Sequence, residues 1–185
     1  MARTPAAAAP NTSSEKTSSA STTTIIHKNL PPESANIVVE FFSDTATPDT
    51  SLNYNCNDFY SHLICDVLKA DLVQHGRISC TVTVQPSVTN DYNGLHGGAI
   101  ASIAERLAIA CARTVVALDK QLFLGELSMS YLSVAAQNEV LAVDGSVVRS
   151  GRNLTVVAIE FRIKKTQKPV YLARATLYHM PASKL

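Results

Sequence analysis

Residues 97–118 are apolar at almost every position, and this run constrains the fold more than any other feature of the chain. Ala, Ile, Leu and Val fill most of it, whereas Ser102, Glu105 and Arg106 lie at helical spacings of three and four. Polar residues spaced in this way share one narrow stripe of a helix. The sequence therefore predicts a helix that the rest of the protein surrounds on nearly every side. The charges within it argue against a membrane span.

Segments that alternate between polar and apolar residues predict strands around this helix. One is 78–84, and four more follow the helix at 122–134, 138–149, 152–164 and 169–179. Tight connections such as Gln137-Asn138 and Ser150-Gly151 indicate mostly antiparallel neighbours. The pattern predicts an α+β fold, in which a curled antiparallel sheet of about five to six strands wraps round one long central helix.

The first part of the chain differs in composition. Residues 1–24 are rich in Ala, Ser, Thr and Pro and predict a disordered tail. Residues 25–54 predict a short helix at 35–42, capped by Ser34, followed by a linker. Asn57 or Asp58 could cap a further helix with apolar positions up to Leu68. We therefore expect the compact domain to span 55–182.

Composition and two terminal segments limit the partners and the cellular compartment that we expect for this chain. The formal net charge is +1, without a Lys/Arg stripe, so we expect no nucleic-acid partner. The four cysteines lack CxxC spacing and nearby His ligands, so neither a metal site nor a cofactor is expected. The final tripeptide, Ser183-Lys184-Leu185 (183–185), matches a peroxisomal address and predicts the peroxisomal import receptor as a partner. Residues 1–24 also resemble a transit peptide, which leaves a chloroplast or mitochondrion as the alternative.

The residues that open the apolar helix suit chemistry at a carbonyl group. Gly97 and Gly98 stand where backbone N–H groups are unpaired, so they could hold a developing oxyanion; the alternative is a flexible turn. His96 could polarise the carbonyl, or simply cap the helix. Asn90 could orient the nucleophile or the water, or could be an ordinary turn residue.

A single carboxylate, Glu105, follows nine residues after this histidine. An acid on an otherwise apolar helix could serve as the general base or as the nucleophile. The alternative is an ion pair with Arg106 or Arg113, or plain solvation. Arg106 points about 100° away round the helix, which weakens that alternative.

Four short motifs follow one another along the chain: Asn90-x-x-x-Gly94-x-His96-Gly97-Gly98, Ile103-Ala104-Glu105, Leu127-x-Met129-x-Tyr131-Leu132 and Ser150-Gly151-Arg152. Together, over residues 56–180, they resemble the hotdog-fold acyl-CoA thioesterases of the PaaI-like and 4-hydroxybenzoyl-CoA thioesterase-like superfamily. The resemblance implies hydrolysis of an acyl-CoA to free acid and CoA by a homodimer or homotetramer. It also implies that Glu105 faces the His-Gly-Gly loop of the other subunit, and that Arg149, Gly151 and Arg152 contact CoA.

Two positions depart from that family. Leu124 stands where many relatives present Ser or Thr to the attacking water, and Ile109 stands where some have a polar residue. Glu126 or backbone groups could hold the water instead, or activity could be low. The open alternatives are a thioesterase for an aromatic acyl-CoA, such as 1,4-dihydroxy-2-naphthoyl-CoA, and a non-catalytic acyl-CoA-binding protein. A third alternative is a hotdog hydratase, but the Asp/His pair that this activity usually needs is not found in the sequence.

Overall fold

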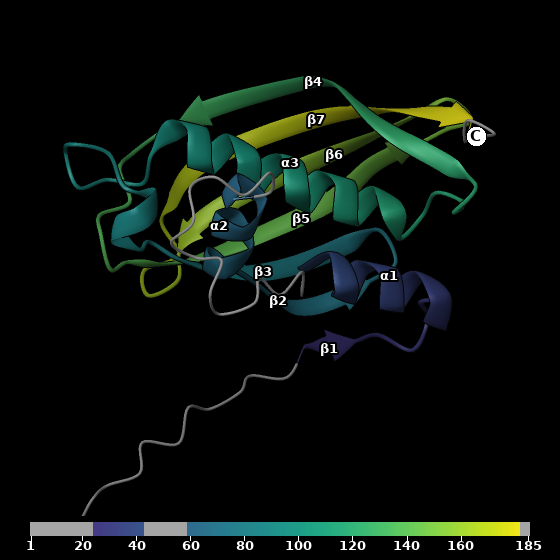
Figure 1. Ribbon diagram of the computed structural model, residues 1–185, viewed down its shortest axis with the longest axis horizontal. Coiled ribbons are helices and arrows are strands. Elements are labelled where there is room, and N and C mark those ends of the chain that lie inside the picture. The colour runs from purple at the N-terminus through teal and green to yellow at the C-terminus, as the bar shows by residue number, and fades with distance from the viewer. Residues whose placement is uncertain (1–23, 43–58, 182–185) are drawn as a thin grey trace, which may run out of the picture.

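The computed structural model describes residues 24–42 and 59–181, and shows a sheet curled round one long helix, α3 (Gly97–Arg113) (Figure 1). The seven strands of the described part run in the order β1-β2-β3-β5-β6-β7-β4. All neighbouring pairs are antiparallel except β1 and β2. The α+β hotdog architecture expected from the sequence is confirmed. The strands are β1 (Ile25–Ile26), β2 (Leu68–Gln74), β3 (Arg77–Thr83), β4 (Lys120–Tyr131), β5 (Val140–Ser150), β6 (Leu154–Ile163) and β7 (Pro169–Pro181).

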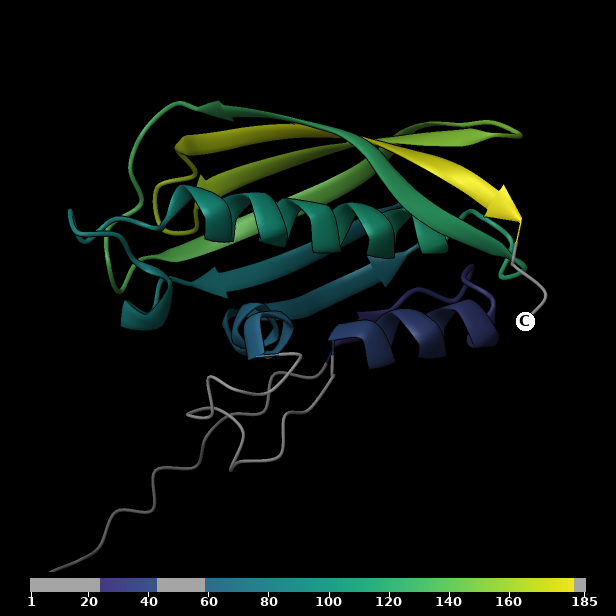
Figure 2. The same ribbon diagram turned by 45° about the horizontal axis from the view of Figure 1, so that its top comes forward.

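Helix α3 lies inside the curl, with strands above and below it (Figure 2). Ile103, Leu107 and Cys111 follow one another down its sheet-facing side and are fully buried. Gly145 on β5 allows the helix to lie close, because a Cβ at this position would come within 2.7 Å of the Cys111 Sγ. The helix ends at Arg113, five residues earlier than expected, where the Thr114 hydroxyl donates to the Cys111 carbonyl and accepts the Gly76 N–H.

The two shorter helices lie beside β2 and also contact α3. They are α1 (Pro32–Phe42) and α2 (Phe59–Val67). The predicted cap at Ser34 is wrong, because α1 begins at Pro32, where proline suits the first helical turn. Leu30, Val38 and Phe42 join the common hydrophobic core. The packed unit therefore includes residues before the expected domain start at 55.

Strand β2 differs from what the sequence predicts. The apolar spacing predicts a helix that continues through Leu68, but the chain turns into β2 at that residue. Gly76, with φ of 74°, then makes the tight turn that lets β2 pair with β3. The four later strands are confirmed with end shifts of a few residues.

Several expectations fall outside the described residues: the tail up to residue 23, most of the linker, the helix cap at Asn57 or Asp58, and the tripeptide 183–185. The peroxisomal address and its transit-peptide alternative stay predictions. Within 24–42 and 59–181, no helix is long and apolar enough to span a bilayer. The same residues contain no group of three or more acidic, His or Cys side chains placed to hold a metal ion.

Candidate active site

His96 caps the N-terminus of α3. Its Nδ1 accepts the Gly98 N–H at 3.0 Å, so the capping interpretation is confirmed. This bond places the ring proton on Nε2, which leaves an exposed N–H donor on the other side of the ring. The Gly98 N–H is thereby occupied, whereas the Gly97 N–H has no acceptor among the described residues. Gly97 N and His96 Nε2 are therefore donors that remain available at this end.

Asn90 builds the loop that leads to this cap. Its Oδ1 accepts the N–H groups of Tyr92 and Gly94, each at 3.1 Å, which is the turn chemistry expected of asparagine. Asn90 and Gly97 line one shallow cavity together with Tyr131. The carboxamide nitrogen of Asn90 makes no hydrogen bond with the described part of the protein and can still donate.

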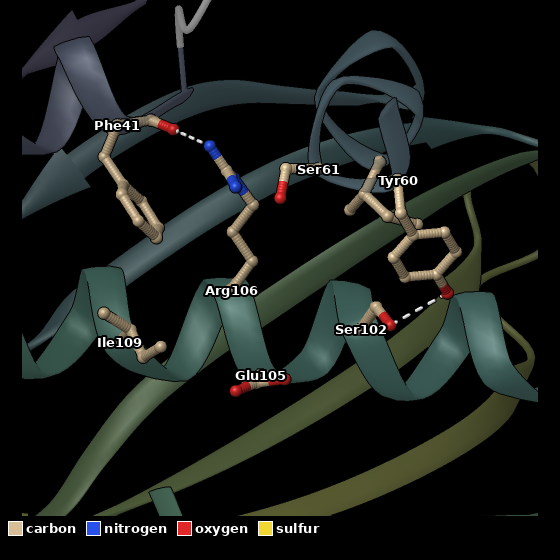
Figure 3. Close-up of a pocket in the computed structure, with 8 residues that line it drawn as sticks. Phe41, Tyr60, Ser61, Ser102, Glu105, Arg106 and Ile109 are labelled. Carbon is tan, nitrogen blue, oxygen red and sulfur yellow. Dashed lines mark hydrogen bonds between the residues drawn. The ribbon is translucent and has the colours of Figure 1, made fainter. Parts of the chain in front are cut away.

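Glu105 is half-buried at the rim of a different cavity, with a volume of about 300 Å³. It makes no hydrogen bond or ion pair within residues 24–42 and 59–181. In Figure 3, Arg106 and Ser102 extend from α3 towards α1 and α2, whereas Glu105 lies on another side of the helix. Arg106 instead donates to the Phe41 carbonyl oxygen, and Arg113 donates to that of Lys120 at 2.6 Å. The ion-pair interpretation of Glu105 is therefore wrong.

One subunit does not bring the predicted residues together. Gly97 and Glu105 are eight residues apart on a straight helix, which separates them by about 12 Å along its axis. The β5–β6 turn with Arg149, Gly151 and Arg152 lies at the opposite end of α3 from His96. Gly76 locates this turn, because it bonds to both segments. Its N–H donates to Thr114 at the C-terminal end of α3, and its carbonyl accepts the Val147 N–H near the end of β5.

The substitutes proposed for the missing Ser or Thr find no support in a single subunit. Glu126 pairs with Thr176, and both face the side of the sheet away from α3, so Glu126 cannot hold a water at Glu105. Leu124 packs against the core, and Ile109 lines the Glu105 cavity. The hydroxyl groups that line the same cavity as Glu105 come instead from Ser102, Tyr60 and Ser61.

Ser102 and Tyr60 were not predicted as site residues. Their hydroxyl groups lie 3.0 Å apart, and Ser102 also donates to the Gly98 carbonyl (Figure 3). The spacing of Ser102 and Arg106 along one stripe was a signal that this face of α3 is not core. Nothing in the sequence indicated that Phe41 and Tyr60 complete the cavity, because the chain brings them from separate helices.

Burial controls the titratable groups deeper in the fold. Burial raises the pKa of the Cys80 thiol, and it raises the pKa of the Cys111 thiol to about 12, so burial disfavours the nucleophilic thiolate form of both. Burial also raises the pKa of Tyr171, whose hydroxyl oxygen accepts the Ala135 N–H at 2.9 Å. This tyrosine fixes the segment that follows β4 close to the Asn90 loop.

Comparison with known proteins identifies the family of the chain. The family model described as "Thioesterase superfamily" matches residues 92–170. The candidate esterase F42H10.6 of Caenorhabditis elegans is 30% identical over 132 residues, which cover 71% of this chain and 72% of that protein.

Solved structures show the same fold at low identity. Zebra fish thioesterase superfamily member 2 has a TM-score of 0.65 at 16% identity, covering 78% of this chain and 96% of its own. A hypothetical thioesterase from Streptococcus pneumoniae, crystallised with coenzyme A, has a TM-score of 0.56 at 21% identity, covering 62% and 89%. The chain belongs to the thioesterase superfamily, whose members hydrolyse thioesters on the hotdog fold.

Proposed function

We propose that this protein is an acyl-CoA thioesterase whose active site forms between two copies of the chain. The observation that carries the proposal is the carboxylate of Glu105, which has no partner within 24–42 and 59–181 and lies half-buried on an open face of α3. The oxyanion donors at Gly97 and His96 lie about 12 Å from it in the same subunit. A second subunit could supply the missing half of each site.

Strand β4 is a suitable edge for such pairing. It is the last strand of the described sheet, twelve residues long, with no neighbour on its outer side. A long unpaired edge readily pairs with another chain. Exposed apolar side chains accompany it: Phe123, Tyr131, Leu132 and Val134, of which Val134 is 67% exposed. A twofold axis beside β4 would pair two copies of this edge and cover these side chains.

The helix and the edge strand agree on where that axis would lie. If Glu105 faces Gly97 of the partner subunit across a twofold axis, the axis passes at Ala101, four residues from each. Strand β4 runs antiparallel to α3, because Lys120 bonds to Arg113 and Tyr131 approaches Gly97. Ala101 is about a quarter of the way along the helix from Gly97. The corresponding position on β4, a quarter of the way from Tyr131 to Lys120, is Ser128. The same axis would therefore pass beside Ser128.

The proposed reaction uses these groups in sequence. The thioester carbonyl oxygen accepts hydrogen bonds from Gly97 N and His96 Nε2 of one subunit. Glu105 of the other subunit takes a proton from water as the oxygen attacks the carbonyl carbon. The tetrahedral intermediate collapses, the carbon–sulfur bond breaks, and the CoA thiolate takes the proton from Glu105. Direct attack by the carboxylate on the carbonyl is the alternative first step.

Coenzyme A as the thiol carrier is supported by the solved S. pneumoniae relative that contains it. Arg149 near the end of β5 and Arg152 in the β5–β6 turn are both exposed, and their guanidinium groups could bind phosphate. If the two α3 helices run antiparallel, the C-terminal end of one helix extends past the N-terminal end of the other. The β5–β6 turn of the subunit that supplies Glu105 would then lie beyond His96 of the partner subunit. The bound CoA would then extend from the shared site towards this turn.

A thiol-release assay with a panel of acyl-CoAs tests the proposal. We expect CoA release by the wild type and a loss of about a hundredfold in Glu105→Gln, because the general base is removed without a change in size. Thermal unfolding should be unchanged in that variant. Retained turnover in Glu105→Gln removes this residue from the mechanism, and binding without CoA release identifies a non-catalytic acyl-CoA-binding protein.

A further inference from the structure

We propose that the cavity beside Glu105 binds the acyl group, and that Arg106 selects acyl groups with an oxygen acceptor at the end remote from the thioester. This inference rests on the proposed thioesterase function and names the substrate class of the same site. The shared chemistry is an oxygen acceptor, supplied either by a carboxylate or by a phenolic hydroxyl.

The walls of the cavity suit a small, partly apolar group. Phe41 comes from α1, Tyr60 and Ile64 come from α2, and Ile109 comes from α3, while Glu105 lies at the rim (Figure 3). A volume of about 300 Å³ is at the lower end of the range for ligand sites, which favours a short chain or a single ring. Phe41 precedes residues 92–170, so part of this wall lies outside the segment that the family model matches.

Arg106 is a cation in this cavity without an anionic partner among the residues that the structure describes. Its Nη2 donates to the Phe41 carbonyl, and its guanidinium carbon lies 4.2 Å from the centroid of the Phe41 ring. Its Nε is buried without a hydrogen-bond partner, and its Nη1 makes no hydrogen bond with the described residues. Arg162 shows the contrast, because Asp144 and Glu160 both pair with it. A partly buried, unpaired cation is costly, and a ligand oxygen would offset that cost.

Two other polar groups of the cavity, the Ser102 and Tyr60 hydroxyl groups, are already engaged, whereas the hydroxyl of Ser61 is exposed. The Ser102 hydroxyl donates to Gly98 and bonds to Tyr60. Glu105 accepts hydrogen bonds but donates none when ionised. Arg106 is therefore the charged side chain of this lining with donors to spare, and its contacts with Phe41 hold the guanidinium in place before a ligand arrives. The geometry favours acyl groups that reach Arg106 with an acceptor.

Matched substrate pairs test this assignment. Succinyl-CoA with butyryl-CoA, and 4-hydroxybenzoyl-CoA with benzoyl-CoA, differ mainly in the remote oxygen. We expect the wild type to prefer the oxygen-bearing member of at least one pair by tenfold or more in kcat/KM. The pair that shows the preference distinguishes a carboxylate from a hydroxyl. Equal kcat/KM values within both pairs overturn the inference.

Arg106→Met should reduce the preference to about twofold, because kcat/KM falls further for the oxygen-bearing substrate than for the plain one, mainly through KM. Arg113→Met is the matched control, since Arg113 lies on the same helix and also donates to a backbone carbonyl, but does not line the cavity. A preference that survives in Arg106→Met overturns the inference. If Arg106→Met does not fold, the wild-type comparison still decides. Absence of CoA release from all four substrates counts against the thioesterase proposal instead.

Discussion

The two faces of α3 differ in how fully the rest of the chain satisfies them. On the sheet side, Ile103, Leu107 and Cys111 are fully buried and packed against β5 and β6. On the other side, Gly98 is exposed and Glu105 and Ile109 are half-buried, with the acid left unpaired among the described residues. The first face is fully packed within one chain. The second face stays partly exposed, as is typical of a surface that binds a ligand or another subunit.

The largest expected effect compares the two faces directly. Leu107→Ala should lower the free energy of unfolding by about 2–5 kcal/mol, because it leaves a cavity in a close-packed core. Ile109→Ala, on the open face, should cost less, because this side chain is only partly surrounded. Urea unfolding of both variants measures the difference. Equal losses would show that the open face is also core.

The second prediction concerns complementation between subunits. Glu105→Gln and His96→Ala should each lose about a hundredfold in turnover. Co-refolding equal amounts should restore about a quarter of wild-type activity, because half of the dimers are mixed and each of those has one intact site. A mixture no more active than its components would place the whole site within one chain. Refolded wild type is the control for recovery.

The same contrast explains how far the sequence could be interpreted. The central helix and five of the strands, β3 to β7, were predictable, because their apolar periodicity reflects burial within one chain. Strand β2 was not, since the apolar spacing of α2 runs on through Leu68 and the turn at Gly76 decides the pairing. Glu105 and His96 could be singled out as unusual residues in an apolar setting. The roles of Phe41 and Tyr60 could not, because contacts between distant segments leave no local pattern.

The third prediction tests how closely α3 approaches the sheet. In Gly145→Ala, the new Cβ would lie 2.7 Å from the Cys111 Sγ and 3.0 Å from the Leu107 Cγ. We expect overpacking to cost about 1–3 kcal/mol in thermal or urea unfolding. Gly151→Ala is the control, since its Cβ meets only the Leu154 carbonyl oxygen, at 3.7 Å. Combining Gly145→Ala with Leu107→Ala should cost less than the sum, because the second change makes room for the first.

The smallest effect concerns the register of the proposed subunit edge. If the axis passes at Ser128, a lysine there faces its own copy, and Ser128→Lys should weaken dimerisation a few-fold, less so at high salt. Ser130→Lys is the matched control on the same exposed face. In this register, residue 130 lies opposite Glu126 of the partner subunit, so that lysine should leave the dimer intact or strengthen it.

Sedimentation at several protein concentrations measures both dissociation constants. Opposite effects would fix the axis at Ser128. Equal weakening by both lysines would move the axis along β4, and Glu105 would then no longer face Gly97 of the other subunit. The same measurement therefore tests both the register of β4 pairing and the proposed position of Glu105 opposite Gly97 of the partner subunit.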